Sequence, residues 1–433
     1  MGRKRFFAYI LAAGVFLTAG CSKKADKVKL MDEMQSESGE VTKAEDDFAQ
    51  FRDEETWVDE IRGTYRGQDV GISVKADILV PETTQSMAVE VKMPVLNEEY
   101  RESVLKGAFA DEDIYYYDMA HWTTEGIQKA IESCEFYEDE EHAEGVERDF
   151  LEENKEELKK LRKYLKDSKD EYTKADVYDV NEYIARRDGI WYVLSFSQEE
   201  GNLDIFFSQM DDGFLQKPEG LWEHASYTVE HTYSLDEGIR NLCKLSPEEA
   251  KKEVVSFAEK MGISNLTFVG EQGLGCQPVY DEKAAEWEEK EYDGAVVGIG
   301  YMFSLATGIS GEVCFGAKDY YFRDAFVTNE GVIYFSIRNP VELERVTEHV
   351  SLLPLDKIKE AFLTELSENL DAHCDRERKW FQFDSLELVY LRQMKDRRSN
   401  EGTYLPVWAL KDDEVRIYVN AIDGTVIPEE DIQ

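Results

Sequence analysis

The chain of 433 residues carries 92 acidic and 50 basic side chains, and its formal net charge is −42. Nucleic acids and anionic lipid surfaces carry charge of the same sign, so this composition argues against binding to either of them. Hydrophobic residues form 42% of the chain, which is enough to build buried cores in more than one domain.

The first predicted element is a leader that ends at a cysteine. Residues 3–5 are basic, residues 6–17 are an apolar run too short to span a bilayer, and residues 18–20 are small. This order resembles the lipobox of bacterial lipoproteins, and the resemblance implies that a signal peptide of residues 1–20 is removed. It further implies a diacylglyceryl lipid with palmitate-type chains on Cys21, which anchors the protein at the extracytoplasmic face of the cell membrane. An ordinary secretory signal with an incidental cysteine is the alternative.

A polar segment follows the cysteine. Residues 21–55 are rich in Ser, Lys, Asp and Glu and contain few large apolar side chains. Such a composition cannot bury a core, so it predicts a flexible tether. A coil of this length has a root-mean-square reach of roughly 30 Å.

Residues 56–175 form a predicted N-terminal α+β region. Alternation of apolar and polar residues predicts its strands, and longer periodic segments predict its helices. The strands are expected at 71–80 and 87–95, and the helices at 97–109 and 123–137. A long acidic helix ends the region, and its narrow apolar side consists of Leu151, Leu158, Leu161 and Leu165.

Residues 176–433 form a predicted C-terminal α+β region that is richer in strands. Its best-defined helix begins at Ser246, which completes a capping box with Glu249, and ends at Gly262. The other predicted elements are a hairpin of 189–196 and 203–210, strands at 295–306, 331–337, 383–391, 404–410 and 415–427, and a helix at 354–370.

Single helices separate runs of strands, without regular βαβ alternation. This order predicts an α+β fold with antiparallel sheets, interspersed single helices and two or more subdomains. The order of a helix followed by strands at 247–337 recurs at 354–427, which indicates a weak duplication.

The C-terminal sequence YLPVWALKDDEVRIYVNAIDGTVI, with its Asp423-Gly424 turn, resembles the last strands of PepSY-like domains. More broadly, the chain resembles uncharacterised cell-envelope lipoproteins of Gram-positive, Clostridia-like bacteria over most of residues 72–427. The likeness rests on ADILVPETTQSMAVEVKMPV, SPEEAKKEVVSFAEKMGI, LLPLDKIKEAF and the PVW…NAIDGT end, in that order. It implies a surface lipoprotein, and PepSY-type domains are associated with extracytoplasmic regulation and peptidase inhibition.

The cysteines beyond Cys21 are odd in number, widely spaced and without a Cys-x-x-Cys pair. This pattern argues against both a disulfide framework and a zinc site. Buried free thiols are expected, and one disulfide remains an alternative. These cysteines are Cys134, Cys243, Cys276, Cys314 and Cys374.

Histidines offer little support for a catalytic or metal site. His224 and His231 are seven residues apart, so on a continuous strand they face opposite sides. His373 and Cys374 are adjacent, and sequence neighbours seldom point at one place. P-loop, dinucleotide-binding, His-Glu-x-x-His and EF-hand patterns are missing from the sequence. The sequence therefore predicts no catalytic, cofactor-binding or metal-binding residue, and no cofactor.

Two aromatic clusters, at 114–118 and 319–322, are candidates for ligand contact. If exposed, their rings could stack on sugars or bind a peptide. Packing inside the sheets is the alternative. An open strand edge could also pair with an extended peptide.

These observations favour a lipid-anchored binding or regulatory module over an enzyme. Its partner would be a protein, a peptide or a cell-wall polymer. The acidity promotes solubility through self-repulsion, with a basic partner or weakly bound divalent cations as alternatives. Two other functions stay open: an extracytoplasmic hydrolase of unrecognised type, and a solute-binding lipoprotein with a cleft between two lobes.

Overall fold

The computed structural model describes most of the chain beyond residue 45. The described residues are 46–65, 68–81, 83–137, 148–199, 202–210, 226–235, 237–279, 296–309, 312–315, 324–370, 380–394, 399–412 and 415–428. The chain divides into two units, Met1–Thr42 and Lys43–Gln433, and all described residues belong to the second. The predicted signal peptide and Cys21 lie outside the described residues.

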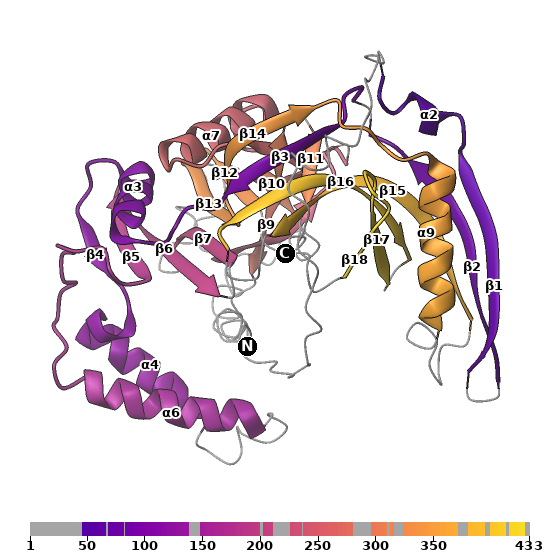
Figure 1. Cartoon of the computed structure of the whole chain (residues 1–433). Helices are drawn as coiled ribbons and strands as arrows, with labels where there is room; N and C mark the ends of the chain where they lie inside the picture. The colour runs from indigo at the N-terminus through magenta and orange to yellow at the C-terminus, as the bar shows by residue number, and fades with distance from the viewer. Residues whose placement is uncertain are drawn as a thin grey trace, which may run out of the picture. The chain divides into compact units, whose positions relative to one another are not determined.

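The predicted α+β fold class is confirmed, with single helices interspersed between mostly antiparallel strands (Figure 1). Within the described ranges, no helix is long and apolar enough to cross a membrane. The helices are α2 (Ala49–Arg52), α3 (Glu98–Phe109), α4 (Thr124–Phe136), α6 (Arg148–Tyr164), α7 (Pro247–Lys260) and α9 (Leu355–Glu368), with a 3₁₀ turn η2 (Met119–His121).

Two helix predictions hold in detail. The Ser246 side chain accepts a hydrogen bond from the Glu249 backbone at the start of α7, and the Glu249 carboxylate accepts one in return. This is the predicted capping box, which satisfies backbone donors at the helix start. Leu158 and Leu161 of α6 are buried against Ile127 of α4, so the long acidic helix packs by its narrow apolar side.

Sheet 1 is antiparallel along all of its described strands. Its long ladder between β9 and β10 is interrupted by two register shifts. From one edge to the other, the strands are β4 (Ile114–Tyr116), β5 (Glu182–Arg187), β6 (Ile190–Glu199), β7 (Asn202–Gln209), β13 (Gly331–Arg338), β12 (Asp324–Thr328), β10 (Val297–Ile309), β9 (Leu266–Val279) and β8 (Ser226–Tyr233).

Sheet 2 is built around a parallel pair of strands from opposite ends of the chain, β2 and β15. Strand β16 pairs with β3 near its start and with β17 near its end. Strand β11 pairs with β10 of sheet 1 and, in parallel, with β15 of sheet 2. The strands are β1 (Thr56–Tyr65), β2 (Gln68–Leu79), β15 (Trp380–Met394), β16 (Glu401–Lys411), β17 (Arg416–Asn420), β18 (Val426–Ile427), β3 (Met87–Lys92), β14 (Glu342–Glu348) and the linking β11 (Glu312–Phe315).

Each sheet has its own hydrophobic core. Core 1 packs α3 and α7 against sheet 1, and core 2 packs α9 against sheet 2 (Figure 1). The predicted division at residue 175 does not separate these cores. Core 1 holds both Val104 and Phe207, and core 2 holds both Ile72 and Trp408. The reason is the parallel pairing of β2 with β15, a long-range contact that local composition does not reveal.

The predicted tether is shorter than expected within its described part. Phe48 and Phe51 are fully buried in core 2, although residues up to 55 are polar on average. The Arg52 guanidinium donates hydrogen bonds of 2.8 Å to the carbonyls of Pro81 and Thr83. Residues 46–55 therefore belong to the folded unit, because two phenyl rings outweigh a polar local composition.

The structure repeats one arrangement of elements, as the sequence indicated. Helix α7 is followed by the antiparallel series β9, β10, β12 and β13, apart from the short β11. Helix α9 is followed by the antiparallel series β15, β16, β17 and β18. The last turn of each series contains a glycine with positive φ, Gly331 at 82° and Gly424 at 76°.

Candidate ligand-binding surface

The histidines and cysteine considered from the sequence form no site in the described chain. His231 lies in β8, and its backbone pairs with Gly275 of β9, while His224, His373 and Cys374 lie outside the described residues. No group of three or more His, Cys, Asp or Glu side chains that could hold a metal occurs within the described ranges. The aromatic cluster at 319–322 also lies outside them, so the cluster at 114–118 is the one that the structure describes.

Cys243 and Cys276 are free thiols, and Cys134 also lies within the described residues. Cys134 and Cys276 are buried, as predicted. Burial raises the pKa of Cys276 to about 11 and also raises the pKa of Cys243. A thiol with a raised pKa stays protonated at neutral pH and is a weak nucleophile, so these cysteines suit packing better than catalysis.

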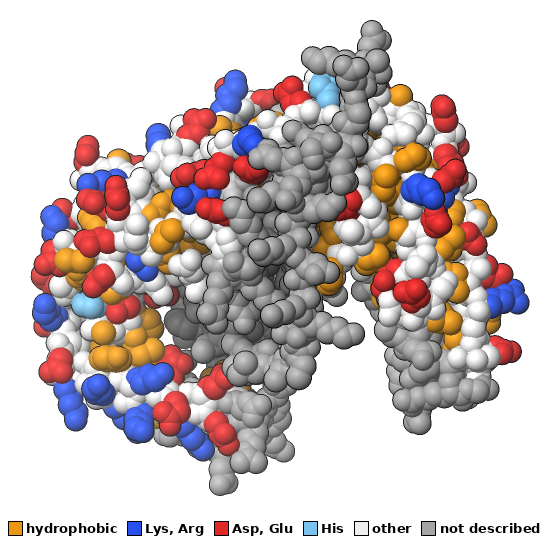
Figure 2. Space-filling model, viewed as in Figure 1, with side chains coloured by type: hydrophobic (Ala, Val, Ile, Leu, Met, Phe, Trp, Pro, Cys, Tyr) orange, Lys and Arg blue, Asp and Glu red, His pale blue; other side chains and the backbone are white. Residues whose placement is uncertain are grey.

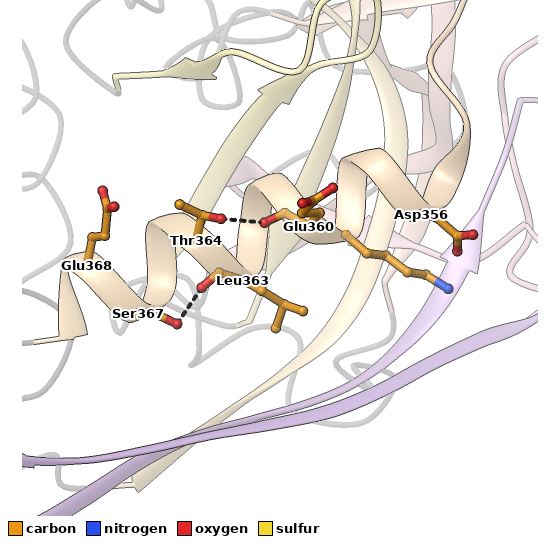
Figure 3. A pocket seen from close by; sticks show the side chains of 7 residues that line it. Asp356, Glu360, Leu363, Thr364, Ser367 and Glu368 are labelled. Atoms are coloured by element: carbon orange, nitrogen blue, oxygen red, sulfur yellow. Dashed lines mark hydrogen bonds between the residues drawn. The ribbon is translucent and has the colours of Figure 1, made fainter.

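A hollow of about 490 Å³ lies along one flank of α9 (Figure 3). Thr364 donates a hydrogen bond of 2.8 Å to the Glu360 carbonyl, and Ser367 donates one of 2.6 Å to the Leu363 carbonyl. Both hydroxyls are therefore engaged with the backbone of the helix. All of the described lining residues belong to α9, so no second described element supplies converging groups for a ligand.

A connected row of half-buried aromatic rings lies beside β4, and we call it the aromatic surface. Its members contact one another in series, with ring centroids 5.4–6.1 Å apart, a separation typical of favourable aromatic pairs. Figure 2 shows hydrophobic side chains that reach the surface near α4. In order of contact, the aromatic surface consists of Tyr115, Trp191, Tyr172, Tyr117 and Trp122.

Strand geometry places the aromatic surface. Ile114 and Tyr116 of β4 point into core 1, so the intervening Tyr115 points to the opposite face. The Thr173 carbonyl accepts a hydrogen bond of 3.0 Å from the Tyr116 backbone, which holds the segment containing Tyr172 against the free edge of β4. Three segments distant in sequence therefore contribute rings to one surface.

A shallow pocket of about 410 Å³ lies at the end of the aromatic surface formed by Tyr115 and Trp191. Its lining contains more acidic than basic side chains. The Arg186 guanidinium, its one lining cation among the described residues, donates a hydrogen bond of 2.8 Å to the Gly189 carbonyl. The acidic lining residues are Asp111, Glu112 and Asp113, and Asp113 forms an ion pair with Lys174.

Polar groups beneath the aromatic surface are bound to one another. The Tyr116 hydroxyl donates a hydrogen bond of 2.8 Å to Asp176, and its ring stacks on His121 with centroids 4.6 Å apart. His121 is in turn hydrogen-bonded to Asp118. Burial raises the pKa of Glu182, and the charge of Asp118 raises it further. The exposed carboxylates at the pocket are therefore the charges that a ligand would meet.

Sequence reasoning identified part of this surface and missed the rest. The cluster at 114–118 contains Tyr115 and Tyr117. Trp122, Tyr172 and Trp191 stand apart in sequence and join the cluster only through the pairing of β4, β5 and the segment near Thr173. The alternation of Trp191 with buried Tyr192 and Leu194 in β6 is a signal that its side chain points away from core 1.

Comparisons with known proteins add little. No protein-family model matches the chain, and no curated protein matches it. One similar solved structure is that of an uncharacterized protein from Eubacterium rectale ATCC 33656, with 11% sequence identity and a TM-score of 0.35. The similarity covers 87% of this chain and 96% of that chain. A likeness this weak carries no inference.

Proposed function

We propose that the protein is a lipid-anchored extracytoplasmic binding module that takes a basic segment of a peptide or protein on the aromatic surface. The lipobox-like sequence ending at Cys21 supports the anchor. The observation that carries the binding function is the pocket where Tyr115 and Trp191 meet an excess of carboxylates.

The chemistry of the pocket favours a cationic ligand. Aromatic faces attract ammonium and guanidinium groups through their quadrupoles, and nearby carboxylates add direct charge attraction. The chain as a whole carries a net charge of −42, which speeds the encounter with a basic partner. A single Lys or Arg side chain reaching Trp191 from such a segment would use both contributions.

Binding can be tested by titrating the full-length protein with short peptides of equal length that are rich in Lys, Glu or Ser. Because any strongly acidic protein attracts basic peptides, the test depends on site variants. Cation–π contacts contribute about 0.5–2 kcal/mol, so Trp191→Leu should weaken Lys-peptide binding about two- to thirty-fold. Trp380→Leu is the matched control, since Trp380 is 52% exposed on β15 and lies outside the aromatic surface.

Equal affinities for the wild type, Trp191→Leu and Trp380→Leu would reject the aromatic surface as the binding site. If neutral cell-wall oligosaccharides bind in a way that depends on Trp191 and the Lys peptide does not bind, the ligand is a glycan and the peptide proposal is wrong. Calorimetry at two salt concentrations separates the two outcomes, because only the cationic ligand should bind more weakly at high salt.

The anchor is tested separately. In a Gram-positive host, the wild type should fractionate with membranes, and Cys21→Ser should leave the membrane fraction. Cys134→Ser serves as the control, because Cys134 is buried between α4 and α6. Retention of Cys21→Ser in the membrane fraction would contradict lipid anchoring at this residue.

A further inference from the structure

The strongest unexplained feature is a buried arginine near the end of β15. Arg392 is 1% exposed, and it ranks among the largest fully buried side chains of the described residues. Its Nε, Nη1 and Nη2 atoms have no hydrogen-bond partner in the described part of the chain. Guanidinium groups stay charged in proteins, so Arg392 cannot escape the cost of burial by losing a proton.

The described residues around Arg392 are largely apolar, and none of their carboxylates forms a hydrogen bond with its guanidinium. Arg392 lies opposite Tyr404 in the β15–β16 register, and Tyr390 is two residues away on the same face. The small core on this face, core 3, consists of Met87, Val89, Val91, Met93, Val341, Tyr390 and Tyr404.

Two acidic side chains on β3 and β15 are engaged elsewhere. Glu90 of β3 forms an ion pair of 2.8 Å with Arg345 of β14. Glu90 lies between Val89 and Val91, whose side chains fill core 3, so it points to the opposite face of the sheet. Glu387 of β15 pairs with Lys411 of β16.

A second buried donor lies on the same face. Trp408 follows Tyr404 by four residues along β16, so the two side chains share a face, and Trp408 is fully buried. Its Nε1 atom has no hydrogen-bond partner within the described residues. Arg392 and Trp408 are therefore both buried donors without an acceptor among the described residues.

We propose that Arg392 binds a small oxyanion, a carboxylate or a phosphate, enclosed on this face of sheet 2. The guanidinium fork matches two oxygens of either group through paired hydrogen bonds. An anion would neutralise the buried charge, which is otherwise strongly unfavourable in an apolar setting. This site is separate from the aromatic surface, and its ligand has the opposite charge.

The test loads the anion during refolding, because a side chain with 1% exposure is closed to exchange in the folded protein. The full-length chain is unfolded in urea, freed of small anions, and refolded with inorganic phosphate, propionate or chloride at constant ionic strength. A ligand that binds only the folded state raises stability in proportion to ln(1 + [L]/Kd). The thermal midpoint of the wild type should therefore rise with the logarithm of the phosphate or propionate concentration above Kd, and not with chloride.

Variants assign the effect to Arg392. Arg392→Met should abolish the response, and Arg392→Lys, which keeps the charge without the fork, should weaken it at least tenfold in apparent affinity. Arg62→Met on the exposed face of β1 is the control and should respond as the wild type does. Native mass spectrometry of the wild type should show one bound anion that Arg392→Met lacks.

A response to propionate alone identifies a carboxylate ligand, and a response to phosphate alone identifies a phosphate ligand. The proposal is overturned if the wild type responds to neither oxyanion, or if Arg392→Met responds as strongly as the wild type. If Arg392→Met does not fold, the wild-type titration and native mass spectrum decide the question.

Discussion

Truncation of Phe51 tests whether residues 46–55 belong to the folded unit. The Phe51 ring is fully buried and meets Trp408 edge to face, with centroids 5.3 Å apart and planes at 81°. Removal of a fully buried phenyl ring costs about 3–5 kcal/mol, and the lost aromatic pair is part of that cost. A folded domain is stable by only about 5–15 kcal/mol, so Phe51→Ala should remove a large share of the stability.

The assay is urea unfolding of the full-length chain, followed by tryptophan fluorescence, since Trp408 reports directly on the contact. Val58→Ala is the control, because Val58 is 72% exposed on β1 and its loss should change stability by no more than about 0.5 kcal/mol. A loss below about 1 kcal/mol for Phe51→Ala would refute the assignment of α2 to core 2. The flexible tether would then extend to residue 55.

Three further predictions concern local packing and titration. Gly107→Ala should destabilise by about 1–3 kcal/mol in thermal unfolding despite better helix propensity, because the new Cβ would lie 2.1 Å from the Lys260 carbonyl oxygen. Ser246→Ala should cost about 1 kcal/mol in urea unfolding at neutral pH. Hydrogen bonds from Ser246 lower the pKa of Glu249 in the folded state. Their stabilisation is therefore present above the pKa that Glu249 has in the unfolded chain, and it is lost as pH falls through the lower pKa of the folded state. Ser246→Ala should reduce this acid-induced loss of stability. Cys276 should resist alkylation at neutral pH until the protein unfolds, as peptide mapping can show, because burial raises its pKa to about 11. Stability unchanged by Gly107→Ala or Ser246→Ala, or rapid native labelling of Cys276, would contradict these contacts.

Local sequence signals predicted the elements better than their assembly. The capping box at Ser246, the alternation in β2 and the Asp423-Gly424 turn are short-range features, and each is present in the structure. The pairing of β2 with β15 joins segments about 300 residues apart, and no local pattern encodes it. The same limit explains why the sequence divided the chain at residue 175, where neither core ends.

Single residues that are buried against the expectation from their neighbours were the second source of error in the sequence predictions. The predicted strand at 383–391 stops before Arg392, and charged side chains are rarely fully buried. The structure continues β15 to Met394 and buries the arginine. Likewise, Phe48 and Phe51 lie in a charged segment and still enter core 2. A composition average hides single residues of this kind, and both cases matter for stability or binding.

The position of the aromatic surface follows from the repeated arrangement of helix and strands. Helix α3 is followed by β4, β5, β6 and β7, an antiparallel series like those after α7 and α9. This first series is interrupted between β4 and β5 by residues 117–181, which carry η2, α4 and α6 and have a small core of their own. Insertions in repeated units often form binding faces, because they are free of the demands of the shared core. Tyr117 and Tyr172 stand near the two ends of the insertion, and their ring centroids are 6.1 Å apart. The aromatic rings therefore gather where the series after α3 differs from the series after α7 and α9.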